Sequence, residues 1–181
     1  MKGKCSGFTL IETIVGMVVL SISFAVLTSL LYPATEQSAS VLHQIRGSEL
    51  AQSMLNEIQQ KAFDENSDKS GGRLRCGETG ITGCSTSMGN EEGDERKQFD
   101  DVDDYHGLIY NVGEIEDSQE NALDYLGYTL SVKVGNDSDY NGVTYEEGDT
   151  DDNRNTAKLI TVTVTTPTGY ELTFSTYRTN H

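Results

Sequence analysis

The sequence predicts an α+β protein in which a long N-terminal helix packs on a C-terminal antiparallel β-sheet. Two observations lead to this fold class. The first third of the chain holds an uncharged apolar run and then a stretch with apolar residues at helical spacing. The last third holds segments in which apolar and polar residues alternate, as they do in strands with one buried face. With 181 residues, the chain is long enough for one globular domain in addition to the apolar run.

The apolar run, Thr13–Tyr32, contains twenty residues and no charge. As a helix it is about 30 Å long, which is enough to cross the hydrocarbon core of a bilayer. Lys2 and Lys4 precede it and hold this end of the chain in the cytoplasm by the positive-inside rule. An uncleaved single-pass membrane anchor explains these features. It does not explain Glu12, a carboxylate at the edge of the span that needs a proton or a partner in lipid.

Residues 34–63 predict a continuation of the helix beyond Pro33. We expect Pro33 to kink or locally unwind the helix, because proline lacks an N–H donor. The apolar positions of the continuation, at helical spacing, are Val41, Leu42, Ile45, Ala51, Met54, Leu55 and Ile58. This stripe is expected to form the surface on which the sheet packs.

Residues 64–99 are rich in Asp, Glu, Ser, Gly and Asn, and they predict a long loop. Cys76 and Cys84 lie within it, with three glycines between them that allow tight closure. In an oxidising compartment such a pair predicts a disulfide. A zinc site is less favoured, because zinc needs four ligands and no histidine lies near the pair. The third cysteine, Cys5, precedes the apolar run.

The second half of the chain predicts the sheet. Alternating segments at residues 125–134, 159–166 and 170–177 predict three strands, and residues 106–112 predict a further short one. Pro167 to Gly169 marks a turn between the last two. Because β-branched residues dominate the alternate positions, we expect an antiparallel sheet with one buried face.

The chain is strongly acidic, with a formal net charge of −16 from 29 acidic and 13 basic residues. No basic patch is visible in the sequence, so nucleic-acid binding is disfavoured. The sequence shows neither a nucleophile elbow nor a Cys–His pairing signal, and His43, His106 and His181 are dispersed. It therefore predicts no enzymatic activity.

Two acidic clusters raise the question of a bound cation. Asp137, Asp139 and Asn141 match the opening of a calcium loop, D-x-D-x-N-G, but Gly148 stands where an EF-hand needs its bidentate Glu. These three residues either contribute to a Ca²⁺ site, with further acids from residues 146–152, or form a polar loop between strands. Apart from this Ca²⁺ alternative, the sequence predicts no cofactor. In the second cluster, residues 100–104, four aspartates repel one another unless a cation or a helix N-terminus offsets their charge.

The junction at residues 7–12, Gly-Phe-Thr-Leu-Ile-Glu, together with the apolar run, resembles the class III leader of type IV pilins and type II secretion pseudopilins. The resemblance implies a prepilin peptidase that cuts after Gly7 and methylates the new amine of Phe8. Glu12 then becomes the fifth residue of the mature chain. In a filament its carboxylate would meet the N-terminal amine of a neighbouring subunit, which would neutralise two charges that are each costly in lipid.

The resemblance also implies a pilin-like form of the predicted α+β fold. Residues 1–7 would be the prepilin leader, residues 8–33 a transmembrane and filament-core helix, and residues 34–181 a periplasmic and later extracellular globular domain. The implied partners are other major and minor pilins, the prepilin peptidase, an inner-membrane assembly platform and, before assembly, the membrane itself.

Four further strings, at residues 30–33, 63–68, 71–78 and 99–107, resemble the minor pilins of the mannose-sensitive haemagglutinin (MSHA) pilus. This narrower resemblance implies a structural subunit that helps to initiate or cap a pilus. It also implies a single-pass inner-membrane protein of a Gram-negative bacterium that later joins a cell-surface pilus. A minor pseudopilin of type II secretion and an adhesive binding module exposed at a filament tip remain as alternatives.

Overall fold

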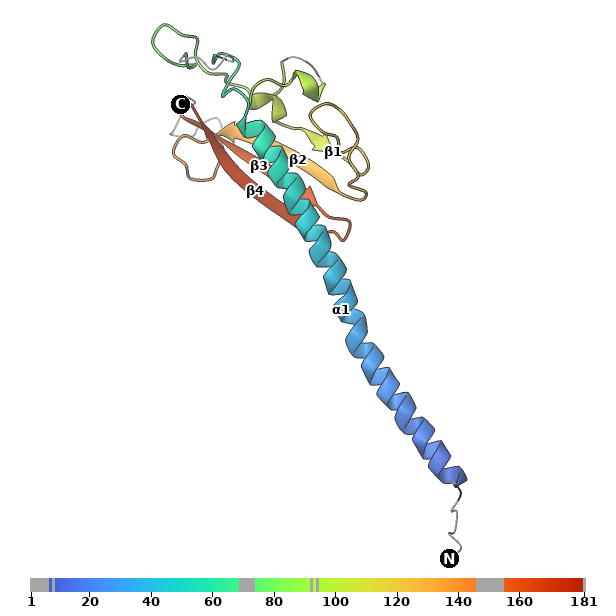
Figure 1. Cartoon of the computed structure of the whole chain (residues 1–181). Helices are drawn as coiled ribbons and strands as arrows, with labels where there is room; N and C mark the ends of the chain where they lie inside the picture. The colour runs from blue at the N-terminus through green and yellow to red at the C-terminus, as the bar shows by residue number, and fades with distance from the viewer. Residues whose placement is uncertain are drawn as a thin grey trace, which may run out of the picture. The chain divides into compact units, whose positions relative to one another are not determined.

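The computed structural model describes residues 7, 9–68, 74–91, 93, 95–145 and 155–180, with the backbone alone at 30–38. The chain divides into two units, Met1–Leu42 and His43–His181. One helix, α1 (Leu10–Gln59), contributes residues to both units, and the strands belong to the second (Figure 1).

In the second unit, the C-terminal part of α1 lies across one face of the β-sheet (Figure 1). Its buried apolar residues follow helical spacing and are Leu50, Ala51, Met54, Leu55 and Ile58. Gly47 allows close packing at the start of this contact, because a Cβ atom there would lie only 2.9 Å from Cδ1 of Leu172. The contact between helix and sheet is the main core of the unit.

The sheet has four antiparallel strands in the order β1-β2-β3-β4. Strand β1 is Ile109–Tyr110, β2 is Thr129–Asn136, β3 is Ala157–Thr165 and β4 is Glu171–Thr179. Strand β3 is central and carries the longest uninterrupted buried stretch, whereas β4 is an edge strand and only partly buried. The β3–β4 connection is the turn predicted at Pro167 to Gly169.

The register of the strands separates an apolar face from a hydroxyl-rich face. Val132 pairs with Val162, and Val162 pairs with Phe174 on β4, so the face that packs on the helix is apolar. On the opposite face the hydroxyl groups of Thr163 and Thr173 lie 3.3 Å apart. This division is what the alternation in the sequence predicts.

The described residues between α1 and β1 are mostly loop and include two short 3₁₀ helices, η1 (Arg96–Gln98) and η2 (Asp103–Tyr105). A parallel bridge between Ala62 and Asp101 brings the two ends of the loop together. This closure carries η2 and the aspartates around it into the interior of the unit.

The predicted α+β arrangement of a helix on an antiparallel sheet is confirmed. Three details of the helix differ from expectation. The backbone of α1 is helical through Pro33 and is not locally unwound there, because one missing hydrogen bond does not interrupt a helix that has full turns on both sides. The expected apolar stripe is buried only in its second half, and Ile45 keeps 51% of its surface exposed. The helix also ends at Gln59 rather than near residue 63.

Candidate functional site

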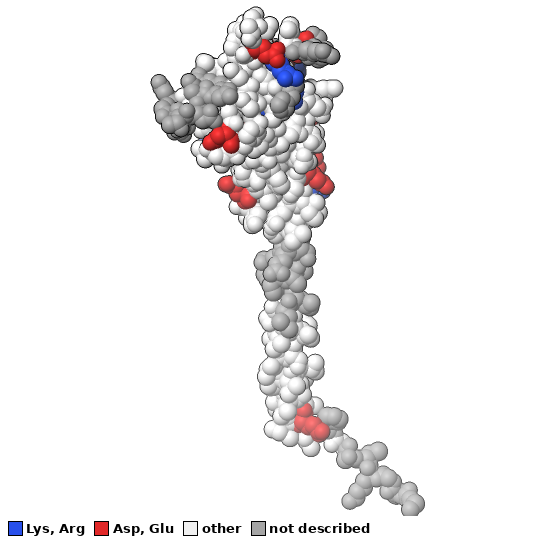
Figure 2. Space-filling view, turned by 90° about the vertical axis from the view of Figure 1, so that its left-hand side faces the viewer, with Lys and Arg blue, Asp and Glu red and all other residues white. Residues whose placement is uncertain are grey.

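The first candidate site is the apolar part of α1. Residues Leu10–Ser29 have a mean hydropathy of 2.3, and none of this segment is buried within the chain. By length and composition it is able to cross a membrane. Figure 2 shows it as a column of uncharged side chains with acidic atoms at one end only, and Glu12 is the only charged residue between positions 9 and 29.

The polar side chains of this segment satisfy their hydrogen bonds within the helix. The hydroxyl of Thr13 donates to the carbonyl of Leu10 at 2.7 Å, and the hydroxyl of Ser21 donates to that of Met17 at 2.8 Å. Ser23, Thr28 and Ser29 do the same with carbonyls one turn earlier. The surface that remains for a partner is therefore apolar, as a lipid or protein environment without water requires.

Glu12 lies in the first turn of α1, where the helix dipole favours a carboxylate. Its N–H is bonded to the carbonyl of Thr9 at 3.1 Å and lies 3.4 Å from the hydroxyl of the same residue. Among the described residues, none forms an ion pair with its side chain. Gly7 lies just before the helix, and Phe8, the residue predicted to carry the new amine, lies outside the described residues.

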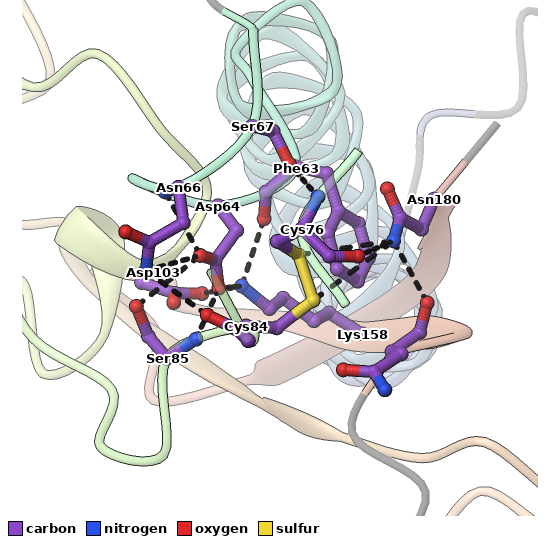
Figure 3. The surroundings of a disulfide bond; sticks show 12 residues. Phe63, Asp64, Asn66, Ser67, Cys76, Cys84, Ser85, Asp103, Lys158 and Asn180 are labelled. Carbon is purple, nitrogen blue, oxygen red and sulfur yellow. Dashed lines mark hydrogen bonds and ion pairs between the residues drawn. A yellow bond between two sulfur atoms is a disulfide. The ribbon is translucent and has the colours of Figure 1, made fainter. Parts of the chain in front are cut away.

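The second candidate site surrounds the disulfide, which joins Cys76 and Cys84 across a Cα–Cα distance of 4.8 Å (Figure 3). The two cysteines form a small buried cluster with Phe63. The side-chain amide of Asn180 donates to the carbonyl of Cys76 at 3.1 Å, which attaches this loop to the end of β4. The disulfide thus closes the loop on itself, and Asn180 holds the closed segment against the end of the sheet.

Beside the disulfide lies a cluster of three charged residues with no exposed side-chain surface, Asp64, Asp103 and Lys158 (Figure 3). The amino group of Lys158, on β3, lies 2.9 Å from Oδ2 of Asp64 and 2.5 Å from Oδ1 of Asp103. It also donates to the carbonyl of Phe63 at 2.8 Å and lies 4.5 Å from the centre of that ring. We call these three residues the buried triad.

The two carboxyl groups of the buried triad have different surroundings. Asp64 accepts hydrogen bonds from the backbone N–H groups of Asn66 and Ser85, at 3.1 and 2.8 Å. Burial raises its pKa, but the charge of Lys158 and these donors outweigh burial and hold the pKa of Asp64 below its usual value. For Asp103 burial dominates and raises the pKa to about 7, although Lys158 opposes the rise.

The triad explains part of how the repulsion among the aspartates at 100–104 is offset. Lys158 supplies the cation, and backbone donors supply the rest: Asp101 accepts the N–H of Asp103 at 2.7 Å, and Asp104 accepts that of Asp100 at 2.8 Å. Burial, together with the charges of Asp103 and Asp104, raises the pKa of Asp101 to about 7. The charge of the cluster is therefore offset by one ammonium group and by backbone donors, and the raised pKa values of Asp101 and Asp103 favour their neutral forms.

The predicted calcium loop is closed by its own donors. Asp137 is 2% exposed, and its carboxylate accepts the N–H groups of Asn141 and Gly142 and the hydroxyl of Tyr177, at 3.1, 2.9 and 2.6 Å. Asp139 accepts the N–H and the side-chain amide of Asn141, at 3.2 and 2.8 Å. The further acids proposed from 146–152 lie outside the described residues. These contacts account for the sequence pattern as an Asx-type loop, and the Ca²⁺ alternative stays a prediction.

The only group of acidic, histidine or cysteine side chains that converges as metal ligands would, among the described residues, is Asp64 with Cys76 and Cys84. Both sulfur atoms are in the disulfide and therefore carry no thiolate. The oxidised protein has no thiolate donor set for a metal at this place.

Sequence reasoning did not find Lys158 and Arg96, the two basic side chains that are buried in the described part of the chain. Lys158 stands in an ordinary strand pattern, and Arg96 lies in a polar stretch of the loop. Arg96 is 6% exposed and pairs with both carboxylate oxygens of Glu57 on α1, the Nε–Oε1 distance being 3.1 Å. Its Nη1 also donates to the carbonyl of Glu116 at 2.7 Å. No local pattern marks either residue, because their partners are distant in the sequence.

Residues 2–28 match the family model of the prokaryotic N-terminal methylation motif. No curated protein and no solved structure matches the chain. The motif supports a type IV pilin-like or pseudopilin family, which is structural rather than enzymatic. It implies processing by a prepilin peptidase and assembly with other pilins. With the apolar part of α1, it fits a membrane-anchored pilin.

Proposed function

We propose that the chain is a minor pilin of the MSHA type, most like MshD, which enters a type IV pilus through α1 and helps to initiate or cap its assembly. The observation that carries the proposal is the class III leader followed directly by an apolar helix with a single carboxylate. The strings at 63–68, 71–78 and 99–107 support the narrower choice of the MSHA system.

In this proposal Gly7 ends the leader, Phe8 carries the methylated amine and Glu12 pairs with the amine of a neighbouring subunit. The described part of the helix supports such a role, since every hydroxyl between Thr13 and Ser29 is bonded within the helix and Glu12 is left as its one charged group. In a packed filament without water, one carboxylate then requires one cation.

Glu12→Gln tests the pairing. We expect the variant to be cleaved and to stay in the membrane, but to enter sheared pili at a level lower by roughly tenfold or more, because breaking one side of a buried ion pair costs about 3–5 kcal/mol. Thr13→Val, one residue further along the same helix, is the matched control and should enter pili normally. Equal incorporation of Glu12→Gln and wild type would contradict the role of the carboxylate.

Two measurements test the wider proposal. Mass spectrometry of the mature N-terminus should find methylated Phe8, and an intact Met1 would contradict the pilin assignment.

A deletion strain should lose most of its pili if the subunit acts in assembly. Normal piliation with lost adherence would instead favour the adhesive module, and lost protein secretion would favour the type II pseudopilin.

A further inference from the structure

The buried triad places an amine against a carboxyl group where neither side chain has any exposed surface. We propose that Lys158 and Asp103 condense to form an intramolecular isopeptide bond, with Asp64 as the group that accepts a proton from the Lys158 ammonium. This modification does not depend on the pilus system in which the subunit works, because it rests on the triad alone.

The contact between Lys158 and Asp103 suits bond formation better than a simple ion pair. Nζ lies 2.5 Å from Oδ1, yet this oxygen has no hydrogen bond of normal angles in the described part of the chain. Oδ2 of Asp103 is also buried, with no described hydrogen-bond donor. When the main contact of a carboxyl group is an amine at this distance, its carbon, Cγ, is accessible to attack by that amine.

Both reacting groups are held on rigid elements. Lys158 is in the central strand β3, paired with Asn136 on one side and Arg178 on the other. Asp103 opens η2, where its N–H donates to Asp101 at 2.7 Å and its carbonyl accepts the N–H of His106 at 2.9 Å. Neither backbone segment has to move for the side chains to meet, so the reaction gains the advantage of a preorganised contact.

The two carboxyl groups divide the roles. Asp103, whose pKa is raised to about 7, is available as the neutral acid that an amine attacks. Asp64, whose pKa lies below its usual value, is available as the carboxylate that takes a proton. Two neighbouring carboxyl groups with pKa values pushed in opposite directions form the usual pattern of an acid–base pair.

The step balances without any other reactant. The Lys158 ammonium gives one proton to the Asp64 carboxylate, and the free amine attacks Cγ of the protonated Asp103. The tetrahedral intermediate loses the second nitrogen proton to the departing hydroxyl group, which leaves as water. A C–N bond forms, a C–O bond breaks, and the products are the amide, one water molecule and neutral Asp64.

The reaction has to occur only once in each molecule, so even a slow rate completes it after folding. The triad has no exposed side-chain surface, and the ring of Phe63 covers the amine at 4.5 Å. The water that is released therefore has little chance to reverse the reaction. The bond would tie η2 to β3 beside the disulfide, so that the loop would have one covalent link to the sheet and one within itself (Figure 3).

The full-length chain, purified from membranes in detergent and then reduced and alkylated, provides the test. Trypsin cannot cut after an acylated lysine, so the bond predicts a branched product of residues 98–133 and 155–178, lighter by one water than the two peptides together. We expect most of the wild-type chain to give this product. A wild-type digest in which Lys158 is cleaved normally would overturn the proposal, as would a link from Lys158 to residues 62–69, which contain Asp64.

Variants check the assignment of roles. Asp103→Ala should give no branched product, whereas Asp103→Asn should give the same product, because the amide loses ammonia in place of water. Asp64→Asn should slow formation by roughly 10²-fold or more, the usual effect of losing a general base. Asp137→Asn, which changes a buried acid in another loop with no contact to the triad, is the matched control and should leave the bond intact. A branched product from Asp103→Ala would overturn the proposal.

Discussion

The two units of the chain reverse the usual placement of side chains in opposite ways. The first exposes an apolar helix, Leu10–Ser29, along its whole length. The second buries charge: Asp64, Asp103 and Lys158 have no exposed side-chain surface, and Arg96 has 6%. Soluble proteins usually bury apolar side chains and expose charged ones, and each departure from this pattern costs free energy. A contacting group, such as an opposite charge or an apolar surface, must offset that cost.

The location of the partner is what differs. The buried charges find their partners inside the unit, at distances of 2.5 to 2.9 Å within the triad. For the apolar helix, the described part of the chain supplies no covering surface, and under the proposed function we expect a lipid or another subunit to cover it. Burial within one chain therefore distinguishes a unit whose unusual side chains are matched inside the chain from a unit whose apolar surface is not.

The largest effect should come from removing the cation of the triad. Lys158→Met removes the group that meets both carboxyl groups, which is an ammonium before the proposed bond forms and an amide afterwards; loss of the ammonium alone costs about 3–5 kcal/mol. For a domain of this size we expect the melting temperature to fall by roughly 10 °C, measured by circular dichroism. Lys133→Met, which changes an exposed lysine on β2, is the control and should change it little. An equal, small change in both variants would mean that the triad does not stabilise the unit.

The converse change is a charge placed on the apolar helix. Val18→Lys should raise the free energy of insertion by about 2.5–3.5 kcal/mol, the cost of lysine at the centre of a span. We expect a clear loss of carbonate-resistant membrane protein and of pilus incorporation. Thr173→Lys adds the same charge to the exposed face of β4 and should have no such effect. If the two variants behave alike, the apolar surface is not in contact with lipid or with other helices.

The apolar helix, the sheet and the nearby cysteine pair could be predicted because their signals are local. Periods of 3.6 and 2 residues need only a short window, and Cys76 and Cys84 are eight positions apart. The triad could not be predicted, since Lys158 and Asp64 are 94 residues apart. The aspartates at 100–104 signalled that a cation or a helix N-terminus should offset their charge, but nothing in the sequence identified Lys158. The prediction that Ile45 is buried was also wrong. Helical spacing predicts which face of the helix is apolar, but it does not predict the residue at which the sheet begins to cover that face.

A smaller effect should appear in the pH dependence of stability. The pKa of Asp101 is about 7 in the folded chain against an ordinary value of 3.8, so the folded state binds a proton that the unfolded state has released between these values. Stability should therefore rise by about 1–2 kcal/mol as the pH falls from 7.5 to 5.5. Asp103 acts in the same direction wherever it is not bonded to Lys158. Asp64 and Asp137, with lowered pKa values, lose their contribution only at still lower pH.

Urea unfolding at the two pH values measures this dependence. Asp101→Asn keeps an oxygen that can accept the N–H groups now bound to Oδ1 but cannot ionise. The variant should be more stable than wild type at pH 7.5 and should show a flatter pH profile. A wild-type profile that rises towards pH 7.5 would mean that the buried aspartates are ionised and fully compensated.

The smallest effect is expected from calcium, and it separates two kinds of acidic cluster. In the loop at Asp137, Asp139 and Asn141, each side chain already accepts backbone N–H donors, so a cation would have to displace bonds that hold the loop closed. We expect no heat of binding and no thermal shift when the full-length chain in detergent is titrated with Ca²⁺. Asp139→Asn is the control, since it removes the charge that a cation would need and should leave the titration unchanged. A thermal shift in wild type that Asp139→Asn abolishes would show that acids at 146–152 complete a calcium site, and the second unit would then also depend on a partner from outside the chain.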